Sequence, residues 1–86
     1  MYEVMVRPDL DKVFEKLSRR DHKQMLIIDK KVGEIRENPH RYKNLKKPLQ
    51  DFKRVHIGHF VLLFSVDEKN KMVILENFKH HDEIYR

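Results

Sequence analysis

Four side chains in the second half of the chain are of the types that metal-free cleavage of an RNA backbone requires: Arg54, His56, His81 and Tyr85. Such cleavage needs a base that takes the proton from a ribose 2′-OH, a cation that stabilises the phosphorane, and an acid that protonates the leaving 5′ oxygen. Histidine titrates near neutrality and serves as base or acid. Arginine binds phosphate, and tyrosine stacks on bases. These residue types predict an RNA site, although such sets are also common on surfaces that only bind.

Positive charge is concentrated in the middle of the sequence. The whole chain carries a formal charge of +5, and residues 40–56 hold six Lys or Arg against one Asp, which alone gives +5. A local basic block favours a polyanion or an acidic partner, and a solvated lysine-rich loop is the alternative. We predict that the RNA backbone is bound by Lys43, Lys46, Lys47, Lys53, His59, Lys79, His80 and Arg86.

The six histidines of the chain raise the question of a metal site. His80 and His81 are adjacent, so they lack the spacing of helical metal ligands, and neither an HExxH pattern nor a cysteine supports zinc. We therefore predict neither a metal nor a cofactor. His56 and His59 also have a plain interpretation as exposed strand residues.

The first half of the chain predicts a strand and two helices. Residues 2–7 alternate between apolar and polar, as a strand does. Pro8 opens a helix with an apolar stripe at the helical period, and residues 21–37 keep that period until Asn38 and Pro39 end it. Residues 18–21 are expected to form the tight connection between these two antiparallel helices.

The second half predicts three strands after a basic loop. Leu45 and Leu49 are expected to pin down the loop of residues 40–50. Strands are expected at residues 52–57, 59–66 and 72–78, with turns at Gly58 and around Asn70. The order βααβββ predicts one α+β domain over residues 1–86, with the helical hairpin on one face of a mostly antiparallel sheet and a short C-terminal tail.

Strand alternation assigns the candidate residues to a face of this sheet. Val55 and Ile57 suit the helix-covered face, which places Arg54 and His56 on an open face. The next strand is expected to send Phe60, Leu62, Phe64 and Val66 to the core, and His59, Val61, Leu63 and Ser65 to the open face. Residues 79–85 are expected to enter that open face from a neighbouring strand.

The sequence offers no signal for membrane insertion or export. It has no apolar run of about 18 residues, and the stretch MYEVMVRP lacks the layout of a signal peptide. Cysteine is absent, which fits a reducing compartment. We therefore expect a cytoplasmic location.

Two segments of the chain resemble the RelE-like toxins of the RelE/ParE superfamily, the toxin half of type II toxin–antitoxin pairs. The segment LKKPLQDFKRVHIGHFVLLFSVDE, from Leu45 to Glu68, resembles the family's "leucine-lysine … Tyr-Arg-x-Arg-x-Gly-Asp-Tyr-Arg" core. The ending KHHDEIYR resembles its "Gly-His-Arg-Lys-Glu-x-Tyr" tail. The resemblance extends over nearly the whole chain and implies a curved sheet behind a helical hairpin.

The resemblance implies a ribosome-dependent endoribonuclease that cuts mRNA in the A site by metal-free 2′-OH attack and so inhibits translation. The implied partners are a cognate antitoxin, mRNA and the ribosome, with 16S rRNA contacted through the basic surface. Arg54 and His56 fall where the family has basic strand residues. His81 stands where a tail arginine is usual, and Tyr85 matches the tail tyrosine.

One position departs from the family pattern in a way that bears on activity. Val61 occupies the place of a frequently catalytic arginine, and valine cannot donate to a phosphate. The alternative is therefore a RelE-fold protein with weak or no cleavage activity, which binds an antitoxin or targets DNA gyrase as the ParE branch does.

Overall fold

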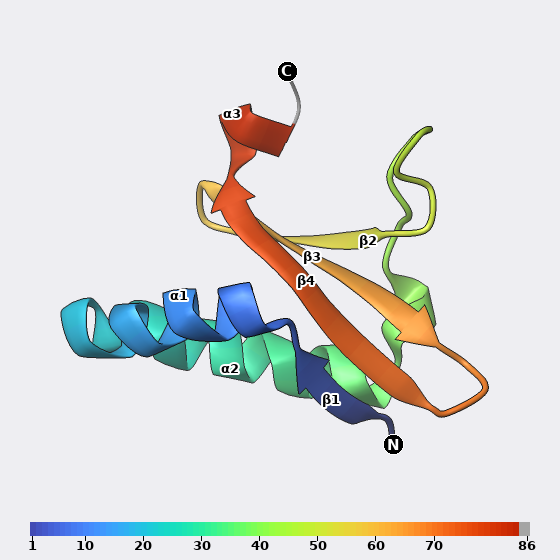
Figure 1. Cartoon of the computed structure of the whole chain (residues 1–86), viewed down its shortest axis with the longest axis horizontal. Helices are drawn as coiled ribbons and strands as arrows, with labels where there is room; N and C mark the ends of the chain where they lie inside the picture. The colour runs from blue at the N-terminus through green and yellow to red at the C-terminus, as the bar shows by residue number, and fades with distance from the viewer. Residues whose placement is uncertain (85–86) are drawn as a thin grey trace.

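The computed structural model describes residues 1–84, so Tyr85 and Arg86 lie outside the described residues. Its elements follow the predicted order, which confirms the α+β fold (Figure 1). They are β1 (Glu3–Val6), α1 (Pro8–Arg20), α2 (His22–Glu37), a 3₁₀ turn η1 (Pro39–Arg41), β2 (Lys53–Ile57), β3 (Phe60–Asp67), β4 (Met72–His80) and α3 (His81–Ile84).

The four strands form a sheet in the order β1-β4-β3-β2. β4 and β3 are antiparallel, as are β3 and β2, because each pair is joined by a short hairpin turn. β1 runs parallel to β4, with Val4 opposite Val73. The two helices carry the chain from β1 to β2 at the opposite edge of the sheet. The sheet is thus mostly antiparallel, as predicted.

The connection between α1 and α2 is shorter than the sequence predicts. Residues 18–20 continue α1, and Asp21 alone separates the two helices. The N–H of Asp21 donates to the carbonyl of Leu17 at 2.7 Å, while its carboxylate accepts the N–H of Gln24 at 3.1 Å. Asp21 therefore closes one helix and caps the next, which removes the need for a longer loop.

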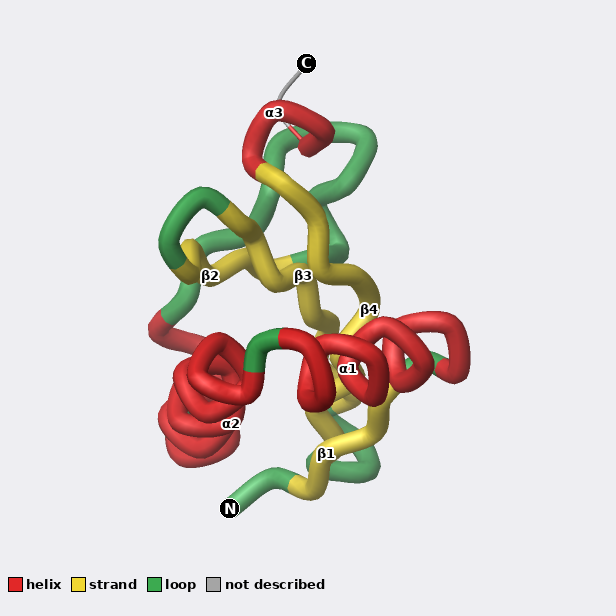
Figure 2. The backbone as a smooth tube through the Cα atoms, turned by 90° about the vertical axis from the view of Figure 1, so that its left-hand side faces the viewer, coloured by secondary structure: helices red, strands yellow, loops and turns green. Residues whose placement is uncertain are grey.

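The main core lies between the helical hairpin and one face of the sheet (Figure 2). Phe14 of α1 and Ile28 and Ile35 of α2 pack on Leu62 and Phe64 of β3. Burial of each such side chain stabilises the fold by about 1.5–3 kcal/mol. Among residues 1–84, no helix has the length and apolar composition needed to cross a bilayer.

The second face of the sheet, which looks away from α1 and α2, is also partly covered. Val61 and Leu63 of β3 do point to this face as predicted, but they are buried under Leu45, with Phe52 and Ile84 packed beside them. The loop before β2 folds back, and the N–H of Leu45 donates to the carbonyl of Phe52 at 2.9 Å. The expectation of an open face was therefore wrong at Val61 and Leu63, because local alternation does not reveal a covering loop.

A β-bulge at Glu76 sets the orientation of the second half of β4. Leu63 pairs with Asn77 and Phe64 pairs with Leu75, so Glu76 is the extra residue in β4. The bulge shifts the alternation by one residue. Phe78 consequently joins the main core, and Lys79 lies in register with Val61 on the second face.

The end of the sheet near the β2–β3 hairpin differs from prediction in three places. Phe60 was expected in the core but is 37% exposed, and it stacks on Phe78 with ring centroids 5.0 Å apart. β4 continues to His80, two residues beyond the predicted strand, and the tail after it begins as the short helix α3 rather than an irregular segment. Pairing with Phe60 extends β4, which a single-strand pattern does not show.

Candidate functional site

A pair of imidazoles forms the centre of the candidate site. The rings of His56 in β2 and His81 in α3 have centroids 5.6 Å apart, with planes inclined by 34°. Both side chains are exposed. The sheet register brings them together: His56 lies opposite Val61, Val61 lies opposite Lys79, and His81 follows two residues later.

The position of His81 is fixed through the backbone. Its N–H donates to the carbonyl of His59 at 2.8 Å, so the first residue of α3 is tied to the β2–β3 turn. Ile84, at the end of the described part of α3, packs on the buried cluster formed by Leu45, Val61 and Leu63. These contacts hold the imidazole of His81 over β2 rather than leaving it on a free tail.

Arg54 lies on the same strand face as His56, two residues earlier, and it is half-buried. Its backbone N–H donates to the carbonyl of Lys43 at 3.1 Å, which ties the basic loop to the edge of β2. The Arg54 side chain lines a cleft of about 550 Å³. The remaining residues of this cleft are Leu45, Lys46, Lys47, Pro48, Leu49 and Ile84.

The structure separates the predicted RNA-binding residues into groups. Lys46 and Lys47 line the cleft. Lys43 is exposed in the same loop, and Lys79 is exposed in β4 opposite Val61. Lys53 has a structural contact instead: its ammonium donates to the carbonyl of Tyr42 at 3.1 Å and to Asn44 Oδ1 at 3.0 Å. Lys53 therefore helps to hold the loop against β2.

His59 and His80 do not join the second face, which corrects the prediction for both. Their rings stack on each other with centroids 6.2 Å apart, and His80 also meets the edge of Phe60. His59 is in the β2–β3 turn, and the bulge at Glu76 turns His80 towards the helix side. Tyr85 and Arg86, predicted for catalysis and RNA binding respectively, lie outside the described residues.

Glu76, which sequence reasoning did not single out, anchors the bulge. Arg7 Nε donates to Glu76 Oε1 at 2.9 Å, and Ser65 Oγ donates to Oε2 at 2.6 Å. Burial acts to raise the pKa of the Glu76 carboxyl, but the hydrogen bonds from Arg7 and Ser65 and the charge of Arg7 outweigh burial and hold the pKa below its ordinary value. No sequence motif marks this glutamate, because its role depends on Ser65 of β3 and on Arg7, which lies between β1 and α1.

A second carboxylate with several hydrogen-bond partners, that of Glu68, lies at the opposite end of the sheet from the imidazole pair. Glu68 accepts hydrogen bonds from Lys71 Nζ at 2.6 Å and from the Tyr2 hydroxyl, and His40 Nε2 contacts the same carboxylate. These bonds, that from Lys71 above all, lower the pKa of Glu68 to about 2. The cluster links Tyr2, which precedes β1, with η1 and the β3–β4 turn.

The groups of this site that could take part in a reaction are the two imidazoles and the cations of the cleft. Within residues 1–84, no three His, Asp, Glu or Cys side chains are grouped in a way that would hold a metal ion. Two adjacent imidazoles can supply a base and an acid, and the cations of the cleft can bind a phosphate. A helical hairpin on one face of a four-stranded sheet, with this basic cleft on the far face, defines a small α+β protein with a surface suited to a phosphate-containing ligand.

Comparison with known proteins gives the family. The chain matches the model of the ParE toxin of type II toxin–antitoxin systems, parDE, over residues 4–85. The chain therefore belongs to this family, and it is a type II toxin of the RelE/ParE superfamily. It is 59% identical over 87 residues to a protein of Methanocaldococcus jannaschii named as a candidate toxin, RelE4, covering 100% of this chain and 93% of that protein.

Solved structures support the fold. The isolated RelE toxin of Escherichia coli superposes with a TM-score of 0.72 at 19% identity, covering 93% of this chain and 84% of that one. A chain of the RelBE2 toxin–antitoxin complex of Mycobacterium tuberculosis gives a TM-score of 0.74 at 21% identity, covering 92% of this chain and 96% of that one. At these identities the likeness establishes the shared fold.

Proposed function

We propose that this toxin is a metal-independent endoribonuclease that cuts mRNA in the ribosomal A site and thereby inhibits translation in the cytoplasm. The observation that carries the proposal is the proximity of His56 and His81, 5.6 Å apart between ring centroids, beside the basic cleft. The RelE fold of the neighbouring structures supports it.

The chemistry assigned to the pair is a two-imidazole transesterification. One neutral imidazole takes the proton of the ribose 2′-OH, and the 2′ oxygen attacks phosphorus while the bond from phosphorus to O5′ breaks. The other imidazole, protonated, donates its proton to the leaving O5′, and the products are a 2′,3′-cyclic phosphate and a free 5′-OH. The reaction returns the two histidines with their protonation states exchanged.

Cations of the cleft act on the phosphate in this proposal. Arg54 stabilises the charge that develops on the phosphorane, since a guanidinium forms strong charge-assisted hydrogen bonds to phosphate oxygens. Lys46 and Lys47 bind the flanking backbone, and Lys43 and Lys79 extend the basic surface towards 16S rRNA and the mRNA. Tyr85 positions the base or phosphate, and Arg86 adds a phosphate contact.

A cognate antitoxin is the proposed protein partner. The RelBE2 and YoeB–YefM neighbours were solved as toxin–antitoxin complexes, which supports this partner for a chain of the same fold. The net charge of +5 favours an acidic wrapping segment. Binding to the folded toxin raises its melting temperature, because a ligand of the folded state stabilises that state.

The test of the function is mRNA cleavage on programmed ribosomes. Wild type, His81→Ala and Tyr85→Ala are compared side by side, in buffers with EDTA at levels that ribosomes tolerate. A-site cuts that wild type makes and both variants lose support the proposal. The absence of cuts by folded, antitoxin-free wild type rules it out.

One observation favours a second function, a toxin without cleavage activity. Val61, which stands at the family's frequent arginine position, is fully buried in the cluster with Leu45 and Leu63, so no donor reaches the phosphate from there. A toxin of this kind acts on another target, as gyrase-directed relatives do. A supercoiling assay with purified gyrase, with and without the antitoxin, tests this second function.

A further inference from the structure

The carboxylate of Glu76 is bound on both of its oxygens at the point where β4 changes its alternation. Arg7 Nε donates to Oε1 at 2.9 Å, and Arg7 Nη2 makes a longer contact with Oε2 at 3.4 Å. Ser65 Oγ donates to Oε2 at 2.6 Å from the neighbouring strand β3. The Glu76 side chain is only 14% exposed, so these charge-assisted bonds are formed largely away from water.

The parallel strand β1 ends beside this carboxylate. Its last pair is Val6 with Leu75, and the N–H of Arg7 then donates to the carbonyl of Leu75 at 3.1 Å. Beyond that point, within residues 1–84, β4 pairs with β3 alone. The register of the last part of β4 therefore depends on its β3 pairs and on the contacts that hold the bulge at Glu76.

The bulge decides which histidine of the tail faces β2. With Glu76 as the extra residue, the N–H of His81 reaches the carbonyl of His59 at 2.8 Å, and the His81 ring lies 5.6 Å from that of His56. A register without the extra residue would move every later residue of β4 by one position. His80 would then occupy the place that His81 has in the structure.

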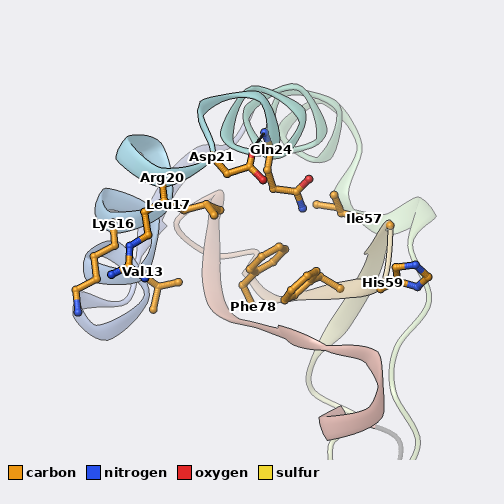
Figure 3. Close-up of a pocket in the computed structure, with 11 residues that line it drawn as sticks. Val13, Lys16, Leu17, Arg20, Asp21, Gln24, Ile57, His59 and Phe78 are labelled. Carbon is orange, nitrogen blue, oxygen red and sulfur yellow. Dashed lines mark hydrogen bonds between the residues drawn. The ribbon is translucent and has the colours of Figure 1, made fainter.

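Phe78 responds to the same register on the other side of the sheet. It lies on the helix side, in a groove of about 570 Å³ that Val13 of α1 and Phe60 of β3 also line (Figure 3). Its ring stacks on that of Phe60 with centroids 5.0 Å apart. The slipped register would put Asn77 in the place of Phe78, so apolar packing and the bound carboxylate of Glu76 favour the same register.

We propose that Glu76 is a positioning residue of the imidazole pair: its bound carboxylate holds the bulge in β4 and so keeps His81, rather than His80, against His56. The inference rests on the proposed cleavage function, which assigns the chemistry to that pair. Glu76 acts through the register of β4 and does not contact RNA. A carboxylate suits this place because it accepts from the donors of two other segments at once.

The first experiment measures the register in solution, by NMR of the full toxin with labelled histidine. Glu76→Ala removes the carboxylate, and Ser65→Ala removes one donor but leaves the pair with Arg7. In wild type we expect a nuclear Overhauser effect between the rings of His56 and His81, and slow hydrogen exchange of the His81 N–H. In Glu76→Ala we expect the ring effect to be lost and this exchange to be at least about tenfold faster, as for loss of hydrogen bonds to a charged group.

Glu15→Ala is the matched control for Glu76→Ala. Glu15 is also paired with an arginine, Arg19 at 2.6 Å, but both side chains are exposed on α1. This variant should keep the wild-type ring effect and exchange rate. A new Overhauser effect between His56 and His80 in Glu76→Ala would identify the slipped register and support the proposal.

The second experiment measures cleavage on programmed ribosomes, well below the melting temperature of each variant. The cations of the cleft lie on β2 and in the loop before it, away from the bulge. Glu76→Ala should therefore leave KM within about twofold of wild type while kcat falls at least about tenfold. Glu76→Gln keeps the length of the side chain and an acceptor for Ser65, so it should recover part of kcat. A residue with only a structural role would change the melting temperature and leave kcat unchanged.

The outcomes separate the positioning role from the cleavage function. A ring effect and an exchange rate that stay at wild-type values in folded Glu76→Ala overturn the proposal. Wild-type kcat in a variant that has lost the ring effect also overturns it, because cleavage would then not need His81 in this place. Loss of the ring effect in Glu76→Ala, together with no cleavage by wild type, supports the role of Glu76 in the register and overturns the cleavage function alone.

Ser65→Ala keeps the test decisive if Glu76→Ala does not fold. It removes one neutral donor, so we expect the His81 N–H to exchange at least about twofold faster than in wild type. An unchanged rate in this variant overturns the proposal. Melting curves establish which variants are folded.

Discussion

The imidazole ring of His56 lies 5.6 Å from that of His81, centroid to centroid, although one belongs to β2 and the other to α3. β3 and β4 lie between them in the chain and provide the register that brings them together. In the proposed reaction, one imidazole accepts a proton from the RNA and the other donates one. This relationship gives the first prediction.

Replacement of either histidine is expected to remove the acid or the base. His56→Ala and His81→Ala should each lower the rate of A-site cleavage by about 10²–10⁴-fold, the usual contribution of a general acid or base. The dependence of the rate on pH should be bell-shaped in wild type and lose one limb in each variant. The measurement is single-turnover cleavage on programmed ribosomes between pH 5 and pH 9.

His22→Ala is the matched control for this prediction, since His22 is exposed at the start of α2. It should cleave at the wild-type rate. Full activity of His56→Ala and His81→Ala would rule out the two-imidazole mechanism. The imidazoles would then have no role in catalysis and could only bind RNA.

Arg54→Ala is expected to weaken the binding and cleavage of RNA while the protein stays folded. The side chain lines the cleft and is half-buried, so its loss removes a phosphate contact more than core packing. Filter binding of single-stranded RNA and thermal unfolding measure the two effects. Arg19→Ala, on the outer side of α1, is the control. A fall in melting temperature as large as that of a core variant would show that Arg54 is structural.

Val61→Arg, which restores the family residue, is expected to destabilise the fold rather than increase cleavage. Val61 is fully buried among Leu45, Leu63 and their neighbours, so the guanidinium would lose its hydration without a partner. The free energy of unfolding should fall by about 2 kcal/mol or more. Urea unfolding checks this.

Met5→Arg is the control for Val61→Arg, because Met5 is 41% exposed on the edge strand β1 and should tolerate the charge. A Val61→Arg variant with wild-type stability and faster cleavage would show that the second face opens in solution.

Glu68 is expected to give a stability contribution that disappears in acid. Its pKa is lowered from 4.5 to about 2 in the folded state, so the carboxylate stabilises the fold at pH values above about 4.5. This contribution is lost progressively as the pH falls through about 2, where folded Glu68 takes up its proton. Wild type should therefore melt above Glu68→Gln at pH 7, and the two melting temperatures should converge near pH 2.

Glu37→Gln, exposed at the end of α2, serves as the control for Glu68. It should differ little from wild type at either pH. A difference between Glu68→Gln and wild type that stays constant down to pH 2 would contradict the assigned hydrogen bonds to Tyr2, His40 and Lys71.

The helices and the order of the elements along the chain could be predicted from the sequence because their signals are local. Apolar residues at the helical period, Pro8 at the start of α1 and Asn38-Pro39 after α2 fix the helical hairpin within a few residues. Alternation likewise assigned Val55 and Ile57 to the core. The length of the α1–α2 connection was predicted wrongly, because Asp21 both ends α1 and caps α2.

The candidate site was predicted in residue types but not in arrangement. Arg54, His56 and His81 were identified by chemistry and by resemblance, whereas the proximity of the two imidazoles depends on pairing across three strands. His80 and His59 were assigned to the wrong face, and the groove between Val13 and Phe60 had no sequence signal. The lining of that groove comes from both halves of the chain.

The sequence by itself determined the helices, the strands and the family of this toxin, because periodicity, capping and motif order depend on neighbours along the chain. Tertiary structure decided which side chains share a face. The bulge at Glu76, held by Arg7 and Ser65, shifts the alternation of β4 and turns Lys79 to one side and His80 to the other. Leu45 and Ile84 cover Val61 from segments on either side of it in the chain. Both effects arise from contacts between residues far apart in sequence, which a local pattern does not contain.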